Sequence, residues 1–544
     1  MKNWWKEGVI YQIYPRSFLD TSGNGIGDLK GITKKINYLS SLGIDAIWIS
    51  PFFKSPMKDM GYDVSDYTDV DPIFGSLKDF KLLLKKAHSK NIKVIIDQVL
   101  SHSSDKHPFF LESRKNKNNP KSDWYVWADP KSDGSPPNNW LSIFGGPAWE
   151  WDTGRQQYYF HNFLKSQPDF NFHNKLVQEW ILSRVKFWLD LGVDGFRLDT
   201  ANYYFHDTKL RNNPKKIIKK EGTEVTNPYY MQNHKYSINQ KENLEFIKRL
   251  RSLTDQYSNI AMVGEIADPL LQAKYTSGKD KLHMAYSFEL LRGKLDAKLI
   301  KNTVDSFYTN SKDGWPCWSF SNHDVVRHLS RWNKSKKNEK KFAKLTCALL
   351  LSLKGTPCIF QGEELGQTQT KIEFNEIKDP PGKKFWPMDF GRDGCRTPMV
   401  WDEKQRHVGF SKGKPWLPIK KEQAKNALKN QVAKESSVYN FYKEFLFARK
   451  KFPQFKEAIC FKKDKNLLIF YRGENKELSC IFNLSSKEVS TKNLYGKLLR
   501  SIPSQNIRAE EKEIVLSDYG FGYFVDNKKM NLRGNFFQNS FSNL

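Results

Sequence analysis

The 544-residue chain lacks any long apolar run. No stretch approaches the roughly 20 consecutive apolar residues of a membrane-spanning helix. The first residues, Met1-Lys2-Asn3-Trp4, also lack an apolar signal core followed by a small-residue cleavage site. We therefore expect a cytoplasmic protein with no membrane partner. Its 39% hydrophobic and 14% aromatic content excludes a disordered chain and indicates a globular one.

Cysteine is scarce, with six residues in the whole chain, and no two of them form a CxxC pair. The sequence therefore indicates neither a zinc motif nor a dithiol redox motif. In a cytosolic chain we expect these residues to be reduced, small and buried.

The lysines are not gathered as a nucleic-acid-binding surface requires, although the net charge is +28. They are spread over several polar segments such as 215–220 and 334–344. Runs of this kind are typical of solvated faces, and a nucleic-acid site would interleave the basic residues with aromatics on one element. We expect no nucleic-acid partner, and the charge has no functional explanation in the sequence.

Eight apolar, strand-like runs are present, and helix-like segments separate most of them. The segment 177–191 has apolar positions at helical spacing and ends at Gly192, a favoured C-terminal cap. Alternating strands and helices predict a parallel sheet, and eight units indicate a closed (β/α)8 TIM barrel. The predicted strands are 8–14, 44–50, 92–100, 193–199, 259–265, 282–288, 315–324 and 356–361.

Three of these runs end in a carboxylate. Arg197 and Asp199 stand two residues apart at a strand end, so their side chains share one face. Glu265 and Asp324 close two other runs. The active site of a TIM barrel is built from strand ends, and a retaining glycosidase needs two carboxylates about 5–5.5 Å apart. An ordinary strand-end ion pair is the alternative for Arg197 and Asp199.

Several segments resemble the α-amylase superfamily (glycoside hydrolase family 13), and within it the bacterial α-glucosidase and oligo-1,6-glucosidase group. The similar segments include Trp4 to Phe18, which looks like the first strand, and Gln167-Pro168-Asp169-Phe170-Asn171. The resemblance runs from Trp4 to about Phe524. It implies the following roles: Asp199 as nucleophile, Glu265 as general acid/base, Asp324 as a carboxylate that holds sugar hydroxyls, and His102, Arg197 and His323 as pocket residues.

The resemblance also implies how the substrate is held. Asp63, next to Tyr62, and an arginine matching Arg396 would grip the non-reducing terminal glucose, which implies exo action. Phe163 matches a pocket aromatic, with core packing as the alternative. Thr200 follows the nucleophile, where threonine accompanies a preference for α-1,4 bonds. A departure from the group is Ser101, which stands in place of the usual asparagine.

The resemblance and the composition of the segments divide the chain into parts. Residues 1–102 and 169–456 are expected to form the barrel. Residues 103–168, after the third strand, are rich in Asp, Asn, Pro, Gly and Trp and form a loop-rich inserted domain. Residues 457–527 contain short alternating segments that predict an antiparallel β-sandwich, and 528–544 form a polar tail.

A loop near the N-terminus spaces oxygen ligands at alternate positions, as hard cations favour. Its ligands would be Asp20, Ser22, Asn24, Ile26 and Asp28, holding a structural Ca²⁺ or Mg²⁺, and a plain turn is the alternative. We expect no cofactor for catalysis.

The sequence thus predicts a retaining exo-α-glucosidase acting on short α-glucosides, with α-1,4-linked maltose as the expected substrate. A transglucosylase or glucoside isomerase on the same scaffold is the enzymatic alternative, and a non-catalytic relative is a more remote one. The expected partner is a small oligosaccharide, and the oligomeric state is left open.

Overall fold

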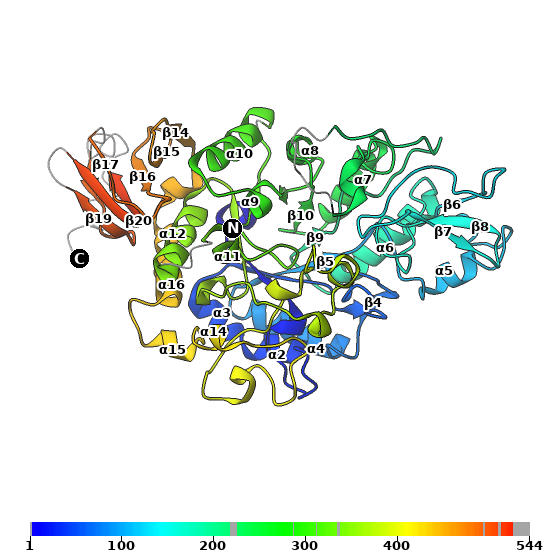
Figure 1. Cartoon of the computed structure of the whole chain (residues 1–544), viewed down its shortest axis with the longest axis horizontal. Coiled ribbons are helices and arrows are strands. Elements are labelled where there is room, and N and C mark those ends of the chain that lie inside the picture. The colour runs from blue at the N-terminus through cyan, green and yellow to red at the C-terminus, as the bar shows by residue number, and fades with distance from the viewer. Residues whose placement is uncertain are drawn as a thin grey trace.

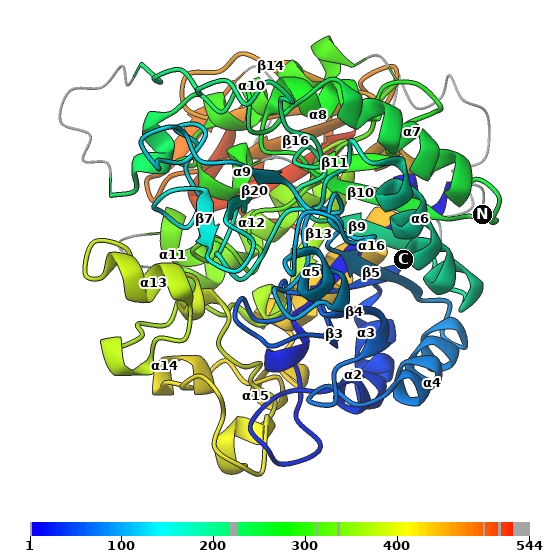
Figure 2. The ribbon, with the colours of Figure 1, turned by 90° about the vertical axis from the view of Figure 1, so that its right-hand side faces the viewer.

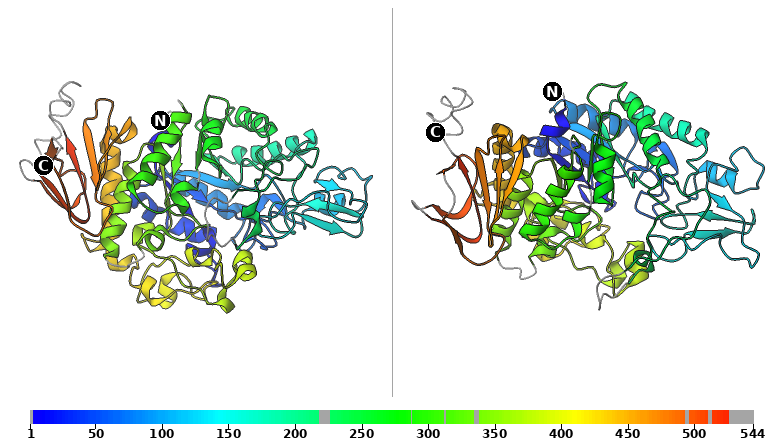
Figure 3. Two further views of the ribbon diagram at one scale, coloured as in Figure 1. Left: turned by 45° about the horizontal axis from the view of Figure 1, so that its top comes forward. Right: turned by 90° about the horizontal axis from the view of Figure 1, so that it is seen from above.

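The computed structural model describes residues 3–217, 226–286, 288–311, 313–333, 338–492, 496–509 and 513–525. Three parts follow one another along the long axis of the molecule (Figure 1). A barrel lies in the middle, the inserted segment with β6, β7 and β8 lies at one end, and the C-terminal sheet lies at the other. Both views of Figure 3 show the two smaller parts at opposite ends of the barrel.

The central part is a ring of eight parallel strands in the order β11-β10-β9-β5-β2-β1-β13-β12. A parallel bridge between Ala285 and Pro316 joins its two ends, so the predicted barrel is confirmed. Each predicted run contains one of its strands: β1 Ile10–Ile13, β2 Ala46–Ile49, β5 Lys93–Gln98, β9 Gly195–Leu198, β10 Ala261–Glu265, β11 Met284–Tyr286, β12 Cys317–Trp318 and β13 Thr356–Phe360.

These strands form because parallel strands are covered on both faces, which favours continuous apolar runs. Every residue of β1, β2, β9, β10 and β13 is buried. Polar residues within such runs therefore point into the barrel interior, as Gln12 and Asp97 do with no exposed surface.

Helices cover the outside of the barrel. Helix α4 begins with a capping box between Ser76 and Asp79. Helix α6 ends just before Gly192, whose φ of 95° suits glycine at a helix C-terminus. The outer helices are α2 Leu29–Lys34, α3 Ile36–Leu42, α4 Leu77–His88, α6 Lys175–Asp190, α7 Glu242–Thr254, α8 Pro269–Thr276, α10 Ala297–Asn310, α12 Glu339–Ser352 and α16 Val438–Lys451.

Shorter elements occupy the connections. Strands β3 Phe53–Lys54 and β4 Asp66–Val70 pair after β2. The long connections after β9 and β13 contain 3-10 turns and short helices. The remaining helices are α1 Trp4–Glu7, α9 Glu289–Arg292, α11 His328–Trp332, α13 Pro380–Phe385, α14 Lys421–Ala424 and α15 Lys429–Val432.

The inserted segment after β5 contains α5 Pro108–Ser113 and a small antiparallel sheet of β6 Trp127–Ala128, β8 Gln157–Phe160 and β7 Trp149–Asp152. Figure 2 looks onto this end of the molecule, so that the inserted segment with α5 and β7 faces the viewer. Two tryptophans of this segment, Trp140 and Trp149, are buried and stack with their ring centres 5.8 Å apart.

The C-terminal part is antiparallel, as expected, and its seven strands hydrogen-bond into one sheet. They belong to one sheet because β20 is long enough to pair with β16, β17, β18 and β19. The strands are β14 Ile459–Lys462, β15 Leu468–Arg472, β16 Leu478–Phe482, β17 Val489–Thr491, β18 Lys497–Leu498, β19 Gln505–Ala509 and β20 Ile514–Val525. The predicted tail, 528–544, lies outside the described residues.

None of the six cysteines forms a disulfide. Five are buried as expected, but Cys460 is exposed, because it lies on the first strand of the C-terminal sheet. Across the described ranges, no helix combines the length and apolar character needed to cross a membrane.

Candidate active site

A cavity of about 1080 Å³ opens at the carboxyl ends of the barrel strands. Its floor includes Asp199, Glu265 and Asp324, the three carboxylates that the sequence places at strand ends. One wall comes from the inserted segment through Phe163 and Gln167. The structure therefore brings together three carboxylates that are far apart in the sequence.

Arg197 connects the carboxylates of the cavity floor. Its Nη1 donates to Asp199 Oδ1 at 2.7 Å and to Asp97 Oδ1 at 2.9 Å, and its Nη2 donates to Glu265 Oε2. The hydroxyl of Tyr286 lies 2.7 Å from the same Nη2. Arg197 is 1% exposed, so this guanidinium is a buried, fixed cation between two cavity carboxylates.

Three carboxylates share this one cation, and burial is the largest influence on each. Burial raises the pKa of Asp97 to about 6, of Asp199 to about 7 and of Glu265 to about 7, while Arg197 opposes each rise. Because the groups interact, their protons belong to the cluster rather than to single residues. Near neutral pH the cluster can therefore retain a proton, as a general acid requires.

Asp324 has different surroundings. Burial alone would raise the pKa of Asp324, but attraction from His323, Arg392 and Arg396 holds it below its usual range. Burial also lowers the pKa of His323 to about 3, so at neutral pH the charge beside Asp324 comes from the arginines. Asp324 Oδ1 accepts from Arg396 at 3.0 Å and from Arg392 at 3.2 Å. Asp324 is thus kept ionised.

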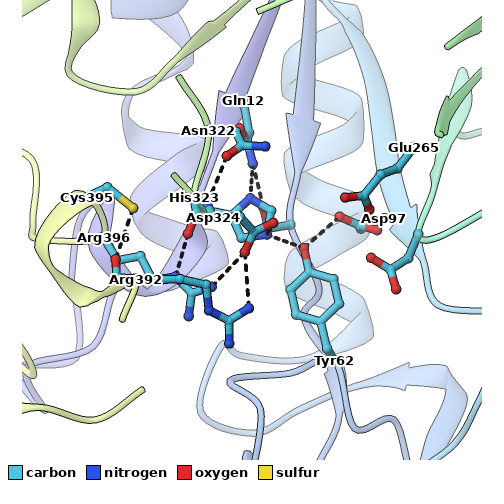
Figure 4. A network of polar contacts seen from close by, with 12 residues as sticks. Gln12, Tyr62, Asp97, Glu265, Asn322, His323, Asp324, Arg392, Cys395 and Arg396 are labelled. Carbon is cyan, nitrogen blue, oxygen red and sulfur yellow. Dashed lines mark hydrogen bonds and ion pairs between the residues drawn. The ribbon is translucent and has the colours of Figure 1, made fainter. Parts of the chain in front are cut away.

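A second set of contacts fixes the ring of His323 beneath the cavity (Figure 4). Gln12 Nε2 lies 2.7 Å from Nδ1 of this ring, and the hydroxyl of Tyr62 lies 2.6 Å from Nε2. The Tyr62 and His323 rings stack with their centres 5.5 Å apart. Tyr62 also donates to Asp97 Oδ2 at 3.2 Å, which links this set to the Arg197 cluster.

The residues predicted to grip the terminal glucose lie behind the cavity wall. Asp63 is fully buried and accepts from the Ser55 hydroxyl and from the backbone N–H groups of Lys58 and Asp59, which fixes a turn. Arg396 donates to the carbonyl of His323 and to Asp324, and neither Asp63 nor Arg396 lines the cavity.

The cavity wall is instead formed by the residues four positions before Asp63 and Arg396. Asp59 and Arg392 both line the cavity, and their side chains are joined at 2.8 Å. Arg392 also binds Asp379 at 2.7 Å and lies beside Arg396 at Asp324 (Figure 4). Sequence reasoning missed this pair, which precedes the predicted residues Asp63 and Arg396 by four positions each.

The remaining predicted pocket residues cluster at one side. His102, Phe163 and Thr200 all line the cavity. The Phe163 ring packs 4.9 Å from the His102 ring and stacks on Tyr203 at 6.0 Å. Thr200 has a φ of 37°, a strained backbone conformation for a β-branched residue, directly after Asp199.

Two further features were not predicted. Asp97 lies in the buried run Val94-Ile95-Ile96-Asp97, and a carboxylate at the end of such a run is the signal that could have identified it. The excursion between β9 and α7 supplies part of the cavity wall through Tyr229 and His234. It has no recognisable periodicity in the sequence.

The predicted cation loop is held by its own hydrogen bonds. Asp20 Oδ1 accepts from the backbone and hydroxyl of Ser22, and Oδ2 accepts from Gly25 N at 2.7 Å and from the Ser411 hydroxyl. Asn24 Oδ1 accepts from Ile26 N at 2.8 Å, and Asp28 accepts from the amide and hydroxyl of Thr21. Among the residues that the structure describes, no group of three or more His, Cys, Asp or Glu side chains could hold a metal ion.

The oxygens of this loop do not fit a cation as they stand, because the chain's own donors already occupy them. Cation binding at the loop stays a prediction, and no catalytic step depends on it.

Comparison with known proteins places these features in a family. The chain is 50% identical to a probable alpha-glucosidase of Rhizobium meliloti (strain 1021), over 95% of this chain and 96% of that one. It is 36% identical to an oligo-1,6-glucosidase of Heyndrickxia coagulans, over 90% and 94% of the two chains.

Solved structures give the same result. An alpha-glucosyl transfer enzyme, XgtA, is 47% identical, with a TM-score of 0.93 over 96% of this chain and 100% of that one. A mutant of MutB, a trehalulose synthase, was solved in complex with sucrose; it is 29% identical and superimposes with a TM-score of 0.87 over 96% of this chain and 100% of that one. The model of the alpha amylase catalytic domain matches residues 12–458. The chain therefore belongs to the alpha-amylase family of glycoside hydrolases and is an enzyme of its α-glucosidase group.

Proposed function

We propose that the protein is a retaining exo-α-glucosidase that releases glucose from the non-reducing end of short α-glucosides by double displacement. One observation carries the proposal: a single buried guanidinium, that of Arg197, contacts both Asp199 and Glu265 on the cavity floor. The shared cation keeps the two carboxylates close to each other and to the cavity, as nucleophile and acid must be.

In the first step Asp199 attacks the anomeric carbon while Glu265 gives its proton to the departing oxygen. The cluster around Arg197 supports this division, because it retains a proton near neutral pH. In the second step Glu265 removes a proton from water, which releases glucose from the glycosyl-enzyme. Asp324, kept ionised by Arg392 and Arg396, is suited to hold sugar hydroxyls as positive charge develops on the ring.

The same proposal assigns the exo specificity to Asp59 and Arg392. Their ion pair lies on the cavity wall and offers charged acceptors and donors to the hydroxyls of a terminal sugar. The bond preference is assigned to Thr200, which lines the same cavity and by family resemblance accompanies a preference for α-1,4 linkage.

Glucosyl transfer is the second candidate, favoured by the size and lining of the cavity. At about 1080 Å³ the cavity holds more than one sugar, and Tyr203, Tyr229 and Phe288 form part of its wall. An apolar wall can bind an acceptor and exclude water. The similarity to XgtA and MutB supports this alternative.

The deciding experiment is a product time course on maltose, isomaltose, sucrose and trehalose. Hydrolysis predicts two monosaccharides in equal amounts from each substrate consumed. Transfer predicts new oligosaccharides or an isomer of the substrate before free glucose accumulates. Absence of turnover on all four sugars would contradict both.

A further inference from the structure

A chain of polar contacts runs from the inserted segment to the carboxylate of Asp199. Gln167 Nε2 lies 3.1 Å from His102 Nε2, and His102 Nδ1 lies 2.9 Å from the hydroxyl of Ser101. The Ser101 hydroxyl lies 3.3 Å from that of Thr200, which lies 3.4 Å from Asp199 Oδ2. All five side chains are buried.

The direction of these contacts follows from the amide of Gln167. Its Oε1 accepts from Leu164 N at 3.0 Å, so its NH2 group points toward Asp59 and His102. An NH2 group only donates, so it favours His102 Nε2 as an acceptor. Burial lowers the pKa of His102 to about 4, so the neutral ring carries its one proton on Nδ1 and donates to Ser101.

In this arrangement each hydroxyl accepts one hydrogen bond and donates the next one. The Ser101 hydroxyl donates to Thr200, and the Thr200 hydroxyl donates to Asp199. The last two contacts are longer than typical O–H···O bonds, as is common for catalytic contacts before a substrate is bound.

The opposite arrangement is also available. His102 Nε2 lies 3.1 Å from the backbone carbonyl of Tyr62, to which a proton on Nε2 would donate. The Ser101 hydroxyl would then donate to Nδ1 and accept from Thr200, leaving Asp199 without this donor. A serine hydroxyl serves both arrangements because it has one donor and two lone pairs.

We propose that Ser101 is a positioning residue that transmits the tautomer of His102 to Thr200 and so decides whether Asp199 receives a hydrogen bond. His102 lines the cavity, and because its Nε2 already accepts from Gln167, the structure favours the tautomer that supplies this bond. The bond fixes the orientation of the carboxylate and favours its ionised form. The inference rests on the proposed function in taking Asp199 as the nucleophile.

The test is a double-mutant cycle on the full chain with p-nitrophenyl α-glucoside and maltose as substrates. Ser101→Ala should lower kcat about two- to tenfold, the range of one hydrogen bond, while KM changes less than about twofold. Ser101→Thr keeps the hydroxyl and should keep kcat. The hydroxyls of Ser101 and Thr200 act in one row of hydrogen bonds. The double variant Ser101→Ala/Thr200→Val should therefore lose no more kcat than the less active of the two single variants.

Two further variants sharpen the test. Ser101→Asn installs the residue usual in the group, whose amide has fixed donor and acceptor atoms, and should lower kcat as Ser101→Ala does. Ser103→Ala is the matched control: its hydroxyl contacts Tyr125 and the carbonyl of Ser104, and it should leave kcat unchanged. Melting temperatures establish that each variant is folded.

The inference would be overturned if the fold-reductions of kcat in the two single variants multiply in the double variant. It would also be overturned if Ser101→Ala changes KM alone. The proposed function fails separately, if the wild type releases no glucose from α-glucosides or Asp199→Asn remains active. If the wild type is active and the effects of Ser101→Ala and Thr200→Val on kcat are independent, only the proposed role of Ser101 is refuted.

Discussion

Replacing Arg392 tests which cation holds the terminal sugar. Its guanidinium contacts Asp59 at 2.8 Å, Asp379 at 2.7 Å and Asp324 at 3.2 Å, and it lines the cavity. Arg392→Ala removes the cation and leaves these carboxylates in a poorly solvated site. Burial already raises the pKa of Asp59 to about 6 against the pull of Arg392, so without Arg392 the Asp59 carboxyl should be protonated at neutral pH.

The expected loss follows from these contacts. Truncating one partner of a buried charge pair costs about 2–5 kcal/mol. At about 1.4 kcal/mol per factor of ten, this predicts a roughly 30- to 5000-fold loss of kcat/KM on maltose. Arg392→Lys keeps the charge but not the forked geometry of the guanidinium, so its kcat/KM should fall less than that of Arg392→Ala. Because Arg396 lies behind the wall, Arg396→Lys should reduce kcat through Asp324 with a smaller rise of KM.

The assay is steady-state kinetics on maltose and maltotriose, with chromatography of the products. Lys383→Ala, an exposed change on α13 outside the cavity lining, serves as the control and should leave kcat/KM unaltered. An Arg392→Ala enzyme within threefold of the wild type would refute the reasoning. Internal cleavage of amylose by the wild type, seen as loss of iodine staining before glucose appears, would refute exo action.

Five further predictions concern the catalytic residues and the stability of the fold. Asp199→Asn should lower kcat by several orders of magnitude at an unchanged melting temperature, because an amide cannot form the glycosyl ester; near-normal glucose release would remove the mechanism. Burial raises the pKa of Glu265 to about 7, so kcat/KM on maltose should fall as pH rises through about 7, where the acid loses its proton. The Glu265→Gln variant should accumulate a glycosyl-enzyme from an aryl glucoside, detectable by mass spectrometry, and azide should restore its turnover. Absence of this adduct would argue against Glu265 as the general acid/base. Thr200→Val should narrow or reverse the maltose-to-isomaltose ratio of kcat/KM several-fold, the scale of one hydrogen bond, and an unchanged ratio would leave this threonine a packing residue. Arg472→Ala should lower the melting temperature by several degrees, because this buried guanidinium donates to carbonyls where α12 meets the C-terminal sheet, whereas the exposed Arg508→Ala should not.

The barrel was predictable because its strands are buried on both faces. A residue such as Ile95 has no exposed surface, and the continuous apolar run around it marks the strand directly in the sequence. Strand ends then locate the site, since all barrel strands are parallel and their carboxyl ends meet at one face. Asp199 and Glu265 could be found in this way without knowledge of their contacts.

The wall of the cavity was not predictable by the same reasoning. Asp59 and Asp63 belong to one turn, and nothing in the residue types decides which carboxylate turns toward the cavity. The structure decides it through backbone N–H groups, which bind Asp63 inside the turn and leave Asp59 free to meet Arg392. Loops carry no side-chain period, so the facing of their residues depends on such contacts.

The charge of the chain and the charge of the site have opposite signs, and this difference explains why the arginines of the site matter. The chain as a whole carries +28 at pH 7, but its surface lysines act on the site through water and salt, which screen them beyond about 8–10 Å. Within the site, burial raises the pKa of each carboxyl, and the arginines oppose this rise most where one carboxylate meets more than one of them. Asp324, which meets two arginines, stays ionised, whereas the cluster that shares Arg197 keeps a proton near neutral pH. The distribution of Arg197, Arg392 and Arg396 thus separates an ionised carboxylate from a proton-bearing cluster within one cavity, and this separation is what an acid-assisted displacement at a sugar carbon requires.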